Sequence, residues 1–379
     1  MVAMNIELDN FLIFNDFKLN LSYAKKTVHS TIVDEHLHER NNFRYRKLII
    51  LRGANATGKT ALSRVLMGIY NFIAKKEYSA ITGYIENPSK DASFSIDLAF
   101  SDHTLYRISC RISGRSKKQL DYQSGDISVH VSSEAILKND SYESCVSRLT
   151  AKEVIEYESY IKALEQVPSL SWKFEYPFAA EGSQRALEPV APDYYAKVLE
   201  KTLQALDPRI EKVTKIANNE STFLIRYPNN TVLIKDGLLQ EPMKLSRGTA
   251  DGIGVANLIT AIRLKTMEFF FCDEMFSHIH SAAEKAFLSV IIDLLHDDQQ
   301  IFVTTHNAEI LDMDLPLHSF AFLRRDNYDQ NAISCVYASD YIKRNNVSLK
   351  NAVENDIFSS SPDTDDIFVL RDLLLEVSA

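Results

Sequence analysis

The sequence LIILRGANATGKT, residues 48 to 60, decides how the rest of the chain is interpreted. Its first part predicts a short buried strand, and its second part fits the phosphate-binding pattern G-x-x-x-x-G-K-[ST]. The two glycines let the backbone curl, so that successive N–H groups point at one phosphate. A helix with apolar residues at Leu62, Val65, Leu66 and Ile69 follows, and its N-terminal dipole favours an anion at the same place.

The loop therefore predicts a nucleoside triphosphate site, and we expect ATP and Mg²⁺ as its occupants. Lys59 is expected to reach the β- and γ-phosphates and to act in catalysis, and the Thr60 hydroxyl is expected to hold Mg²⁺. A chance match in a strand–helix turn is the alternative. The predicted phosphate contacts are Gly53, Ala54, Asn55, Ala56, Thr57, Gly58, Lys59, Thr60 and Ala61.

The composition is that of an ordinary globular protein, with 25% charged and 45% apolar residues in 379. A net charge of −9 argues against a protein that coats nucleic acid over its whole surface. The four cysteines form no C-x-x-C pair, which favours reduced thiols over a disulfide framework. No apolar run approaches the roughly 20 residues of a membrane span, and the N-terminus lacks a secretion signal. We therefore expect a soluble, cytoplasmic protein with no membrane partner.

Alternating apolar residues predict antiparallel strands in three parts of the chain. We expect one hairpin in residues 4 to 23, a second in residues 93 to 113, and several strands in residues 210 to 238. Residues 133 to 165 and 191 to 206 instead have helical spacing, and these helices are too short for a long coiled-coil arm. The segment between them is expected to be irregular.

Two charged segments leave alternatives open. Residues 34 to 39 (DEHLHE) could ligate a metal or could form a solvated loop. A basic run along the 93 to 113 hairpin could contact a polyanion or could guard a strand edge. Its members are Arg107, Arg111, Arg115, Lys117 and Lys118.

A second candidate anion site lies in residues 245 to 249 (LSRGT), where Ser246, Arg247 and Gly248 open a predicted helix. The unpaired N–H groups at such a helix start, together with the helix dipole, favour a phosphate. An ordinary N-cap by Ser246 is the alternative.

Two later strands end in side chains that suit phosphate chemistry. An apolar strand ends in Asp273 and Glu274, the Walker B pattern. In this pattern Asp273 would hold Mg²⁺ and Glu274 would orient the attacking water. The next buried strand ends in Thr-Thr-His, so His306 would lie at the same sheet edge, near the γ-phosphate. A purely structural histidine is the alternative.

The order of these motifs resembles the ABC-type ATPase head over about residues 4 to 350. The loop with Asn55 looks like those of chromosome-maintenance, RecF-type and OLD-like (overcoming-lysogenisation-defect) ATPases. The nearest resemblance is to OLD-like ATPases of bacterial phage-defence and abortive-infection systems, such as the ATPase subunits of Septu and PARIS. It rests on residues 245 to 249, Asp273-Glu274 with His280-Ser281, residues 304 to 307 (TTHN) and residues 323 to 326 (LRRD).

The resemblance implies an α/β fold, namely a P-loop NTPase of the ABC-ATPase type. We expect a mixed sheet with an added antiparallel β subdomain and a helical insertion. The expected units are residues 1–130 (N-terminal hairpins and P-loop half of the head), 131–209 (helical insertion), 210–350 (signature, Walker B and His-motif half) and 351–379 (C-terminal helical tail).

The chain departs from the family pattern in three places. Residues 277 to 281 (SHIHS) replace the S-A-L-D loop of transport-type heads, and the two histidines there leave a metal site as an alternative. His280 resembles a histidine that OLD-like members carry. Arg247 replaces the small second residue of the commoner Ser-Gly-Gly signature. Gln119 and Gln123 lie in range of the family's glutamine lid, without a supporting pattern.

OLD nucleases carry a Toprim domain after the His motif, which needs roughly a hundred residues and a Glu before an Asp-x-Asp. Only 73 residues follow His306, and the Asp-x-Asp at Asp312 and Asp314 comes directly after the His strand. We therefore expect no built-in nuclease and a separately encoded effector protein.

In ABC-type heads the phosphate loop of one protomer faces the Ser–Gly helix start of another. The resemblance thus implies an ATPase that ATP joins into a homodimer or higher oligomer, controlling its effector in anti-phage defence; nucleic-acid binding is left open. The alternative is a RecF-like DNA-repair ATPase that binds duplex DNA through Arg107, Arg111 and Lys117. An orphan transporter ATPase and a small-molecule kinase are further alternatives; the kinase would not require Ser246 or His306.

Residues 367 to 377 predict a helix that is apolar nearly all round. Such a helix is expected to be buried, either against the chain's own core or against a partner subunit.

Overall fold

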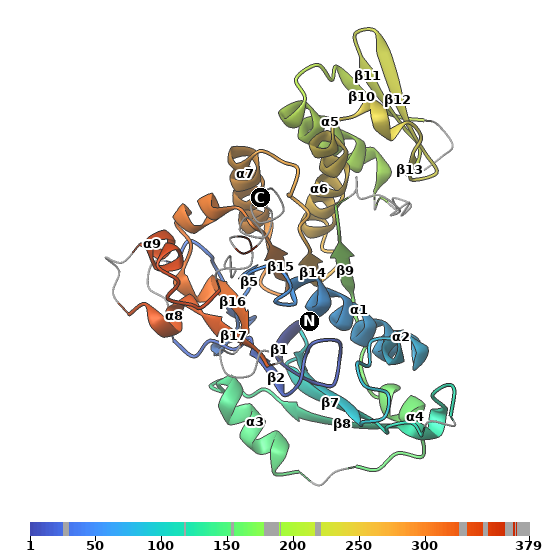
Figure 1. Ribbon diagram of the computed structural model, residues 1–379, viewed down its shortest axis with the longest axis vertical. Helices are drawn as coiled ribbons and strands as arrows, with labels where there is room; N and C mark the ends of the chain where they lie inside the picture. Colours follow the sequence, from blue (N-terminus) through green and yellow to red (C-terminus); the bar gives the residue numbers. More distant parts are fainter. Residues whose placement is uncertain are drawn as a thin grey trace, which may run out of the picture.

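The centre of the computed structural model is a six-stranded sheet in the order β17-β16-β5-β15-β14-β9 (Figure 1). The structure describes residues 1–25, 30–116, 119–152, 155–177, 189, 191–216, 221–325, 332–343, 348–360, 367 and 369. Five strands of the sheet are parallel and the sixth, β17, runs antiparallel to β16. Their bounds are β5 (Leu48–Arg52), β9 (Trp172–Glu175), β14 (Phe269–Cys272), β15 (Gln300–Thr304), β16 (Phe320–Arg325) and β17 (Ile333–Tyr337).

The central strands are apolar because helices or a second sheet cover both faces. In β5, Ile49 and Leu51 join a core cluster that also contains α1 (Lys59–Lys75). Leu48 and Ile50 point to the opposite face, where they join residues of α6 and α7. The period of two in a strand explains this division. The bounds of the covering helices are α6 (Arg247–Arg263) and α7 (Ser281–Leu294).

A five-stranded antiparallel sheet, in the order β2-β1-β6-β7-β8, shares the core cluster of α1. It lies below the central sheet in Figure 1. The predicted hairpins over residues 4 to 23 and 93 to 113 are confirmed as β1–β2 and β6–β7. The bounds are β1 (Val2–Asp9), β2 (Phe17–Asn20), β6 (Ala92–Ala99), β7 (Thr104–Ile112) and β8 (Ile127–Ala135).

A separate lobe at the top of Figure 1 consists of α5, α6 and the antiparallel sheet β10–β13. The strands predicted in residues 210 to 238 are confirmed there. Helix α6 is apolar nearly all round because it serves two cores: Ile253 packs in the lobe, and Val255 packs against the central sheet. The bounds are α5 (Pro192–Leu206), β10 (Lys212–Lys215), β11 (Phe223–Tyr227), β12 (Asn230–Lys235) and β13 (Leu238–Leu239).

The helical expectation for residues 131–209 needs correction in two places. Strand β8 continues to Ala135, and β9 is an edge strand of the central sheet, paired in parallel with β14. Strand β9 is only four residues long, and its partner lies about a hundred residues away, so no local pattern marks it. Residues 36 to 39, for which the sequence left a solvated loop or a metal site open, belong to a short hairpin of β3 (His36–Leu37) and β4 (Arg40–Arg44).

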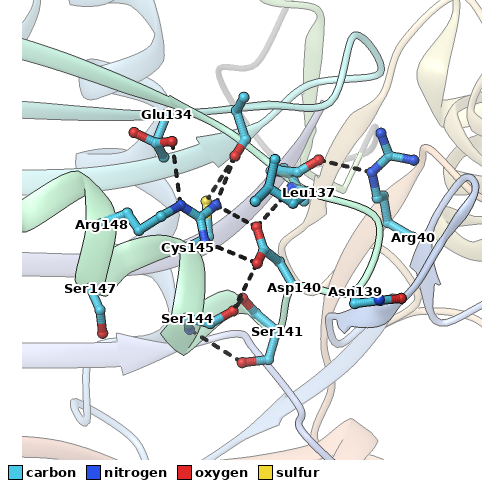
Figure 2. A network of polar contacts seen from close by, with 12 residues as sticks. Arg40, Glu134, Leu137, Asn139, Asp140, Ser141, Ser144, Cys145, Ser147 and Arg148 are labelled. Carbon is cyan, nitrogen blue, oxygen red and sulfur yellow. Dashed lines mark hydrogen bonds and ion pairs between the residues drawn. The ribbon is translucent and has the colours of Figure 1, made fainter.

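Helix α3 (Tyr142–Thr150) is held against β8 by a network that we call the α3 clamp, centred on Asp140 (Figure 2). Arg148 Nη1 donates to Asp140 Oδ1 at 2.9 Å, and its Nε lies 3.4 Å from Glu134 Oε1. The Arg148 bond is the main cause that holds the pKa of Asp140 below its ordinary value. Ser141 caps the helix by accepting a bond from the Ser144 N–H at 3.3 Å.

The C-terminal tail corrects another expectation in part. Ile367 and Val369 are helical but 65% and 54% exposed, so these two side chains are not buried in the chain's own core. Residues 368 and 370 to 377 lie outside the described part of the chain. Among the described residues, no helix is both long and apolar enough to cross a lipid bilayer. The remaining short elements are α2 (Ser79–Thr82), α4 (Tyr160–Leu164), α8 (Ala338–Tyr341), α9 (Leu349–Glu354), η1 (Ser124–Asp126), η2 (Pro242–Lys244), η3 (Ala308–Asp312) and η4 (Leu317–Ser319).

Candidate nucleotide site

The loop between β5 and α1 curls around its own lysine. Lys59 Nζ donates to the carbonyls of Gly53 and Ala54, at 2.9 and 3.2 Å, and Thr57 Oγ1 donates to the Ala54 carbonyl at 2.8 Å. Gly58 precedes α1 with a φ of 102°, a conformation that disfavours any L side chain. These bonds preform the curl that the sequence predicts.

The rest of the predicted phosphate contacts surround this curl. Thr60 and Ala61 lie in the first turn of α1, and Asn55 and Ala56 are exposed at the loop tip. The loop is braced from β16, since Arg325 Nη2 donates to the Ala56 carbonyl at 2.8 Å. Arg325 belongs to the 323 to 326 segment of the sequence resemblance; Asp326 lies outside the described residues.

Lys59 is a nearly buried cation, with 5% of its surface exposed. Burial lowers the pKa of its ammonium, and the nearby carboxylates of Glu274 and Asp273 oppose that change. Its present partners are two neutral carbonyls, so a charged phosphate oxygen would be a stronger partner for the same group.

The carboxyl ends of β5, β14 and β15 meet at one edge and bring the Walker B residues to the loop. Thr304 Oγ1 donates to Asp273 Oδ1 at 2.8 Å and accepts the Glu274 N–H at 2.8 Å. The Thr60 side chain is also hydrogen-bonded to Asp273. Burial raises the pKa of Asp273, and the bonds from Thr304 and Thr60 oppose the rise. A hydroxyl and a carboxylate side by side are oxygen donors that fit Mg²⁺.

Glu274 and His306 form a pair in front of this edge. His306 Nε2 lies 3.0 Å from Glu274 Oε1, and the two side chains are 52% and 38% exposed. Glu274 has a φ of 52°, in the left-handed region. A non-glycine residue in such a conformation costs about 1–3 kcal/mol, and such strain is concentrated at functional sites.

A buried polar network behind His306 was not predicted from the sequence. Glu284 of α7, 3% exposed, accepts bonds from Thr305 Oγ1 and Asn307 Nδ2, both at 2.8 Å. Arg52, the residue before the loop glycine, donates to the Asn307 carbonyl. The partners of Glu284 are 21 and 23 residues away, so no local spacing identifies it.

A cavity of 310 Å³ opens between the phosphate loop and His306. Two of its lining residues, Val353 and Ser360, come from the C-terminal segment, which sequence motifs did not connect with this site. None of its described lining residues belongs to residues 245 to 249. The lining residues are Arg52, Gly53, Ala54, Asn55, His306, Val353 and Ser360.

The predicted second anion site lies at the start of α6. Ser246 caps the helix by accepting the Thr249 N–H at 3.1 Å, and Ser246 and Arg247 are exposed. A Cβ on Gly248 would collide with the His278 carbonyl oxygen, so only glycine allows this close approach. The helix start is thus joined to the loop after Walker B, the segment that replaces the S-A-L-D loop.

That loop is tied to α6 by a second contact, since His278 Nδ1 lies 2.8 Å from the buried carboxylate of Asp251. His280 caps α7 by accepting the Ala282 N–H at 3.2 Å. The two histidines therefore have partners within the chain. Across the described ranges, no group of three or more His, Cys, Asp or Glu side chains is arranged to hold a metal, either here or in residues 34 to 39.

Two members of the basic run of the 93 to 113 hairpin, Arg107 and Arg111, are paired with carboxylates. Arg107 binds the buried carboxylate of Asp97 with two bonds, at 2.8 and 2.7 Å. Arg111 binds Asp91 at 2.6 Å. These partners disfavour a free polyanion surface. The edge-guarding interpretation is wrong for Arg107 and Arg111, because their strand, β7, is paired on both sides, with β6 and with β8. Lys117 and Lys118 lie outside the described residues.

The predicted glutamine-lid candidates lie near η1. Gln119 Nε2 donates to Asp126 Oδ2 at 2.7 Å, and Gln123 precedes the same turn. Neither residue lines the cavity at the phosphate loop.

Known proteins resemble this chain in structure. No protein-family model and no curated protein sequence matches it. An SMC head bound to the C-winged helix domain of ScpA is 13% identical, with a TM-score of 0.51, and the match covers 93% of this chain and 100% of that one. An Smc head with an extended coiled coil, bound to the C-terminal domain of ScpA and derived from Pyrococcus furiosus, is 10% identical, with a TM-score of 0.52 and coverage of 93% and 98%.

The recombination mediator protein RecF of the RecFOR pathway is also similar, at 11% identity and a TM-score of 0.46, with coverage of 88% and 98%. The two SMC heads establish the architecture. This chain has the P-loop NTPase fold of ABC-type ATPase heads, as the motif order predicted.

Proposed function

We propose that this chain is an ATPase that binds ATP with Mg²⁺ and hydrolyses it between two copies of itself. The observation that carries the proposal is the meeting of Thr60, Asp273 and Glu274 at the carboxyl edge of the central sheet. These groups come from one strand end, that of β14, and one helix start, that of α1, which lie more than 200 residues apart in the sequence, and each has the chemistry that its motif requires.

Each side chain has a distinct role in the proposed reaction. Lys59 would exchange its two loop carbonyls for β- and γ-phosphate oxygens, neutralising charge that develops during transfer. Thr60 and Asp273 would hold Mg²⁺, which supplies further charge neutralisation when bound. Glu274 would orient and polarise the attacking water, with His306 beside it and close to the γ-phosphate.

The second wall of the site is proposed to come from another copy. Ser246, Arg247 and Gly248 present an exposed helix start that does not line the cavity at the chain's own phosphate loop. Placed over the γ-phosphate of a partner, its N–H groups and the Ser246 hydroxyl would complete the donor set. ATP would then join the two copies, and hydrolysis would release them.

The cellular role that we propose is control of a separately encoded effector in bacterial anti-phage defence. Its support is the motif resemblance to OLD-like defence ATPases and the likeness to SMC heads that were solved with domains of a separate protein, ScpA. A RecF-like DNA-repair ATPase is the alternative, and it shares the same head chemistry. The pairing of Arg107 and Arg111 with carboxylates disfavours the duplex contacts it requires.

Mixing two inactive variants tests the shared site. Lys59→Ala removes the lysine that binds the phosphates on the phosphate-loop side of the site. This variant should lose ATP binding and turnover but keep its fold. Ser246→Asp keeps a good N-cap but places a negative charge against the γ-phosphate, so it should bind ATP and lose turnover. In a 1:1 mixture half of the dimers hold one copy of each, and one of their two sites has both walls intact, so about a quarter of the wild-type rate should return.

A rate per protomer that rises with protein concentration is the matching expectation for the wild type. Failure of the mixture to regain any ATPase activity, at concentrations where the wild-type rate has reached its plateau, would contradict the shared site.

A further inference from the structure

The loop that carries His306 is anchored from α7. The Glu284 carboxylate accepts one bond from Thr305 Oγ1 and one from Asn307 Nδ2, each at 2.8 Å. The backbone N–H of Asn307 donates to Thr305 Oγ1 at 3.0 Å, which closes a ring of hydrogen bonds through Glu284, Thr305 and Asn307. Glu284 is 3% exposed, so water competes little for these bonds.

His306 lies between the two anchored residues, and its own contact is of a different kind. Its neighbours on both sides bind Glu284, whereas its imidazole extends to the Glu274 carboxylate, at 3.0 Å. It is 52% exposed and lines the cavity at the phosphate loop. The ring therefore fixes the backbone from which His306 projects.

The ring is also connected to the phosphate loop. Arg52 Nη1 donates to the Asn307 carbonyl, and Arg52 lines the same cavity as His306. Burial raises the pKa of Glu284, while the bonds from Asn307 and Thr305 and the charge of Arg52 oppose that rise. Glu284 thus has two hydrogen-bond donors and a nearby cation, so its polar network is satisfied. Satisfied buried networks hold their members rigidly, in orientation as well as in position.

We propose that Glu284 is a positioning residue of the ATPase site, which holds Thr305 and Asn307 so that the His306 imidazole stays against Glu274 and faces the cavity. This inference rests on the proposed function. Glu284 does not line the cavity, so it acts through His306 and not on the nucleotide. Partners one step behind a reacting group commonly change activity by about 10- to 100-fold when they are removed.

Exchanging the amide and the carboxylate tests the geometry directly. Glu284→Gln keeps the shape but cannot accept from both donors, so kcat should fall about tenfold while the ATP dissociation constant changes less than about twofold. The double variant Glu284→Gln/Asn307→Asp reverses one bond, since the Gln amide donates to the Asp carboxylate. It also keeps a negative charge near Arg52, and it should regain most of the lost kcat.

A double-mutant cycle with His306→Ala separates positioning from general damage. If Glu284 acts through His306, Glu284→Gln should cause no further loss of kcat in the His306→Ala background. A further tenfold loss there, or an unchanged kcat in the single variant, would overturn the proposal. Thermal unfolding of each variant identifies any loss of fold.

A readout independent of turnover separates this inference from the proposed function. In protein labelled with ¹⁵N-histidine, the ring resonances of His306, assigned by their absence in His306→Ala, should shift in Glu284→Gln and return in the exchanged pair. Unchanged resonances would refute the positioning role even in an active enzyme. A wild-type chain without ATPase activity would instead refute the proposed function.

Discussion

The edge of the central sheet and the start of α6 both offer donors to a phosphate, but they differ in how much their own chain supplies. At the edge, Asp273 is 3% exposed and is already bonded to Thr304 and Thr60. At the start of α6, Ser246 and Arg247 are exposed, and the Ser246 hydroxyl is engaged in its own helix cap. One region is assembled within the chain, and the other presents its donors outward.

This difference indicates which groups of the molecule are held in place before a nucleotide binds. Groups that must not move during a reaction are held by buried bonds, which lowers the reorganisation needed in the transition state. An exposed helix start keeps its orphan N–H groups hydrated until an anion replaces the water. A site divided in this way would be complete only on assembly, so the two regions should respond differently to substitution.

The largest expected effect comes from the assembled region. Glu274→Gln keeps the size of the side chain and its hydrogen bond to His306 but removes the charge that would polarise water. Since general-base groups contribute about 10²- to 10⁴-fold, kcat should fall by that order while ATP still binds. Size-exclusion chromatography with light scattering should then find an ATP-bound oligomer that does not dissociate.

The control for this variant is ADP, which should give no such oligomer with either protein. A Glu274→Gln preparation that retains the full ATPase rate would remove Glu274 from the mechanism and would leave the strained φ of 52° unexplained by catalysis.

A smaller effect is expected at the outward-facing region. Ser246→Asp should lower the ATPase rate about 10²- to 10³-fold, the order of one lost charge-stabilising contact, with ATP affinity of the isolated protomer unchanged. Ser141→Asp is the matched control, because Ser141 caps α3 in the same way and lies in the α3 clamp (Figure 2). Equal losses in both variants would trace the effect to helix capping.

The same contrast explains what could be predicted from the sequence. The phosphate loop, Asp273, Glu274 and Ser246 were placed correctly on their strand ends and helix start because each belongs to a motif that is contiguous in the chain. Strand β9, Glu284, and the cavity residues Val353 and Ser360 were missed. Their roles in the fold depend on contacts across tens to hundreds of residues, which leave no periodic or local signal.

The smallest effect is expected at Asp140, a carboxylate that lies away from both the edge of the central sheet and the start of α6. Asp140→Asn in the α3 clamp should lower the free energy of unfolding by about 1 kcal/mol, because its partner Arg148 is partly exposed and can be rehydrated. Its ATPase rate should equal that of the wild type. Chemical denaturation followed by circular dichroism measures the first quantity, and a coupled assay measures the second.

The pH dependence of that stability follows from the lowered pKa of Asp140. A carboxyl whose pKa is lower in the folded than in the unfolded state stabilises the fold above the unfolded value, about 3.9, and loses this contribution as the pH falls through the folded value. The difference between wild type and Asp140→Asn should therefore be constant from pH 5 to 7, begin to decrease near pH 4, and disappear once the pH lies below the folded pKa of Asp140. A difference that persists in acid would mean that Asp140 contributes through packing. The α3 clamp would then differ from the Glu284 ring in its physical basis as well as in its distance from the site.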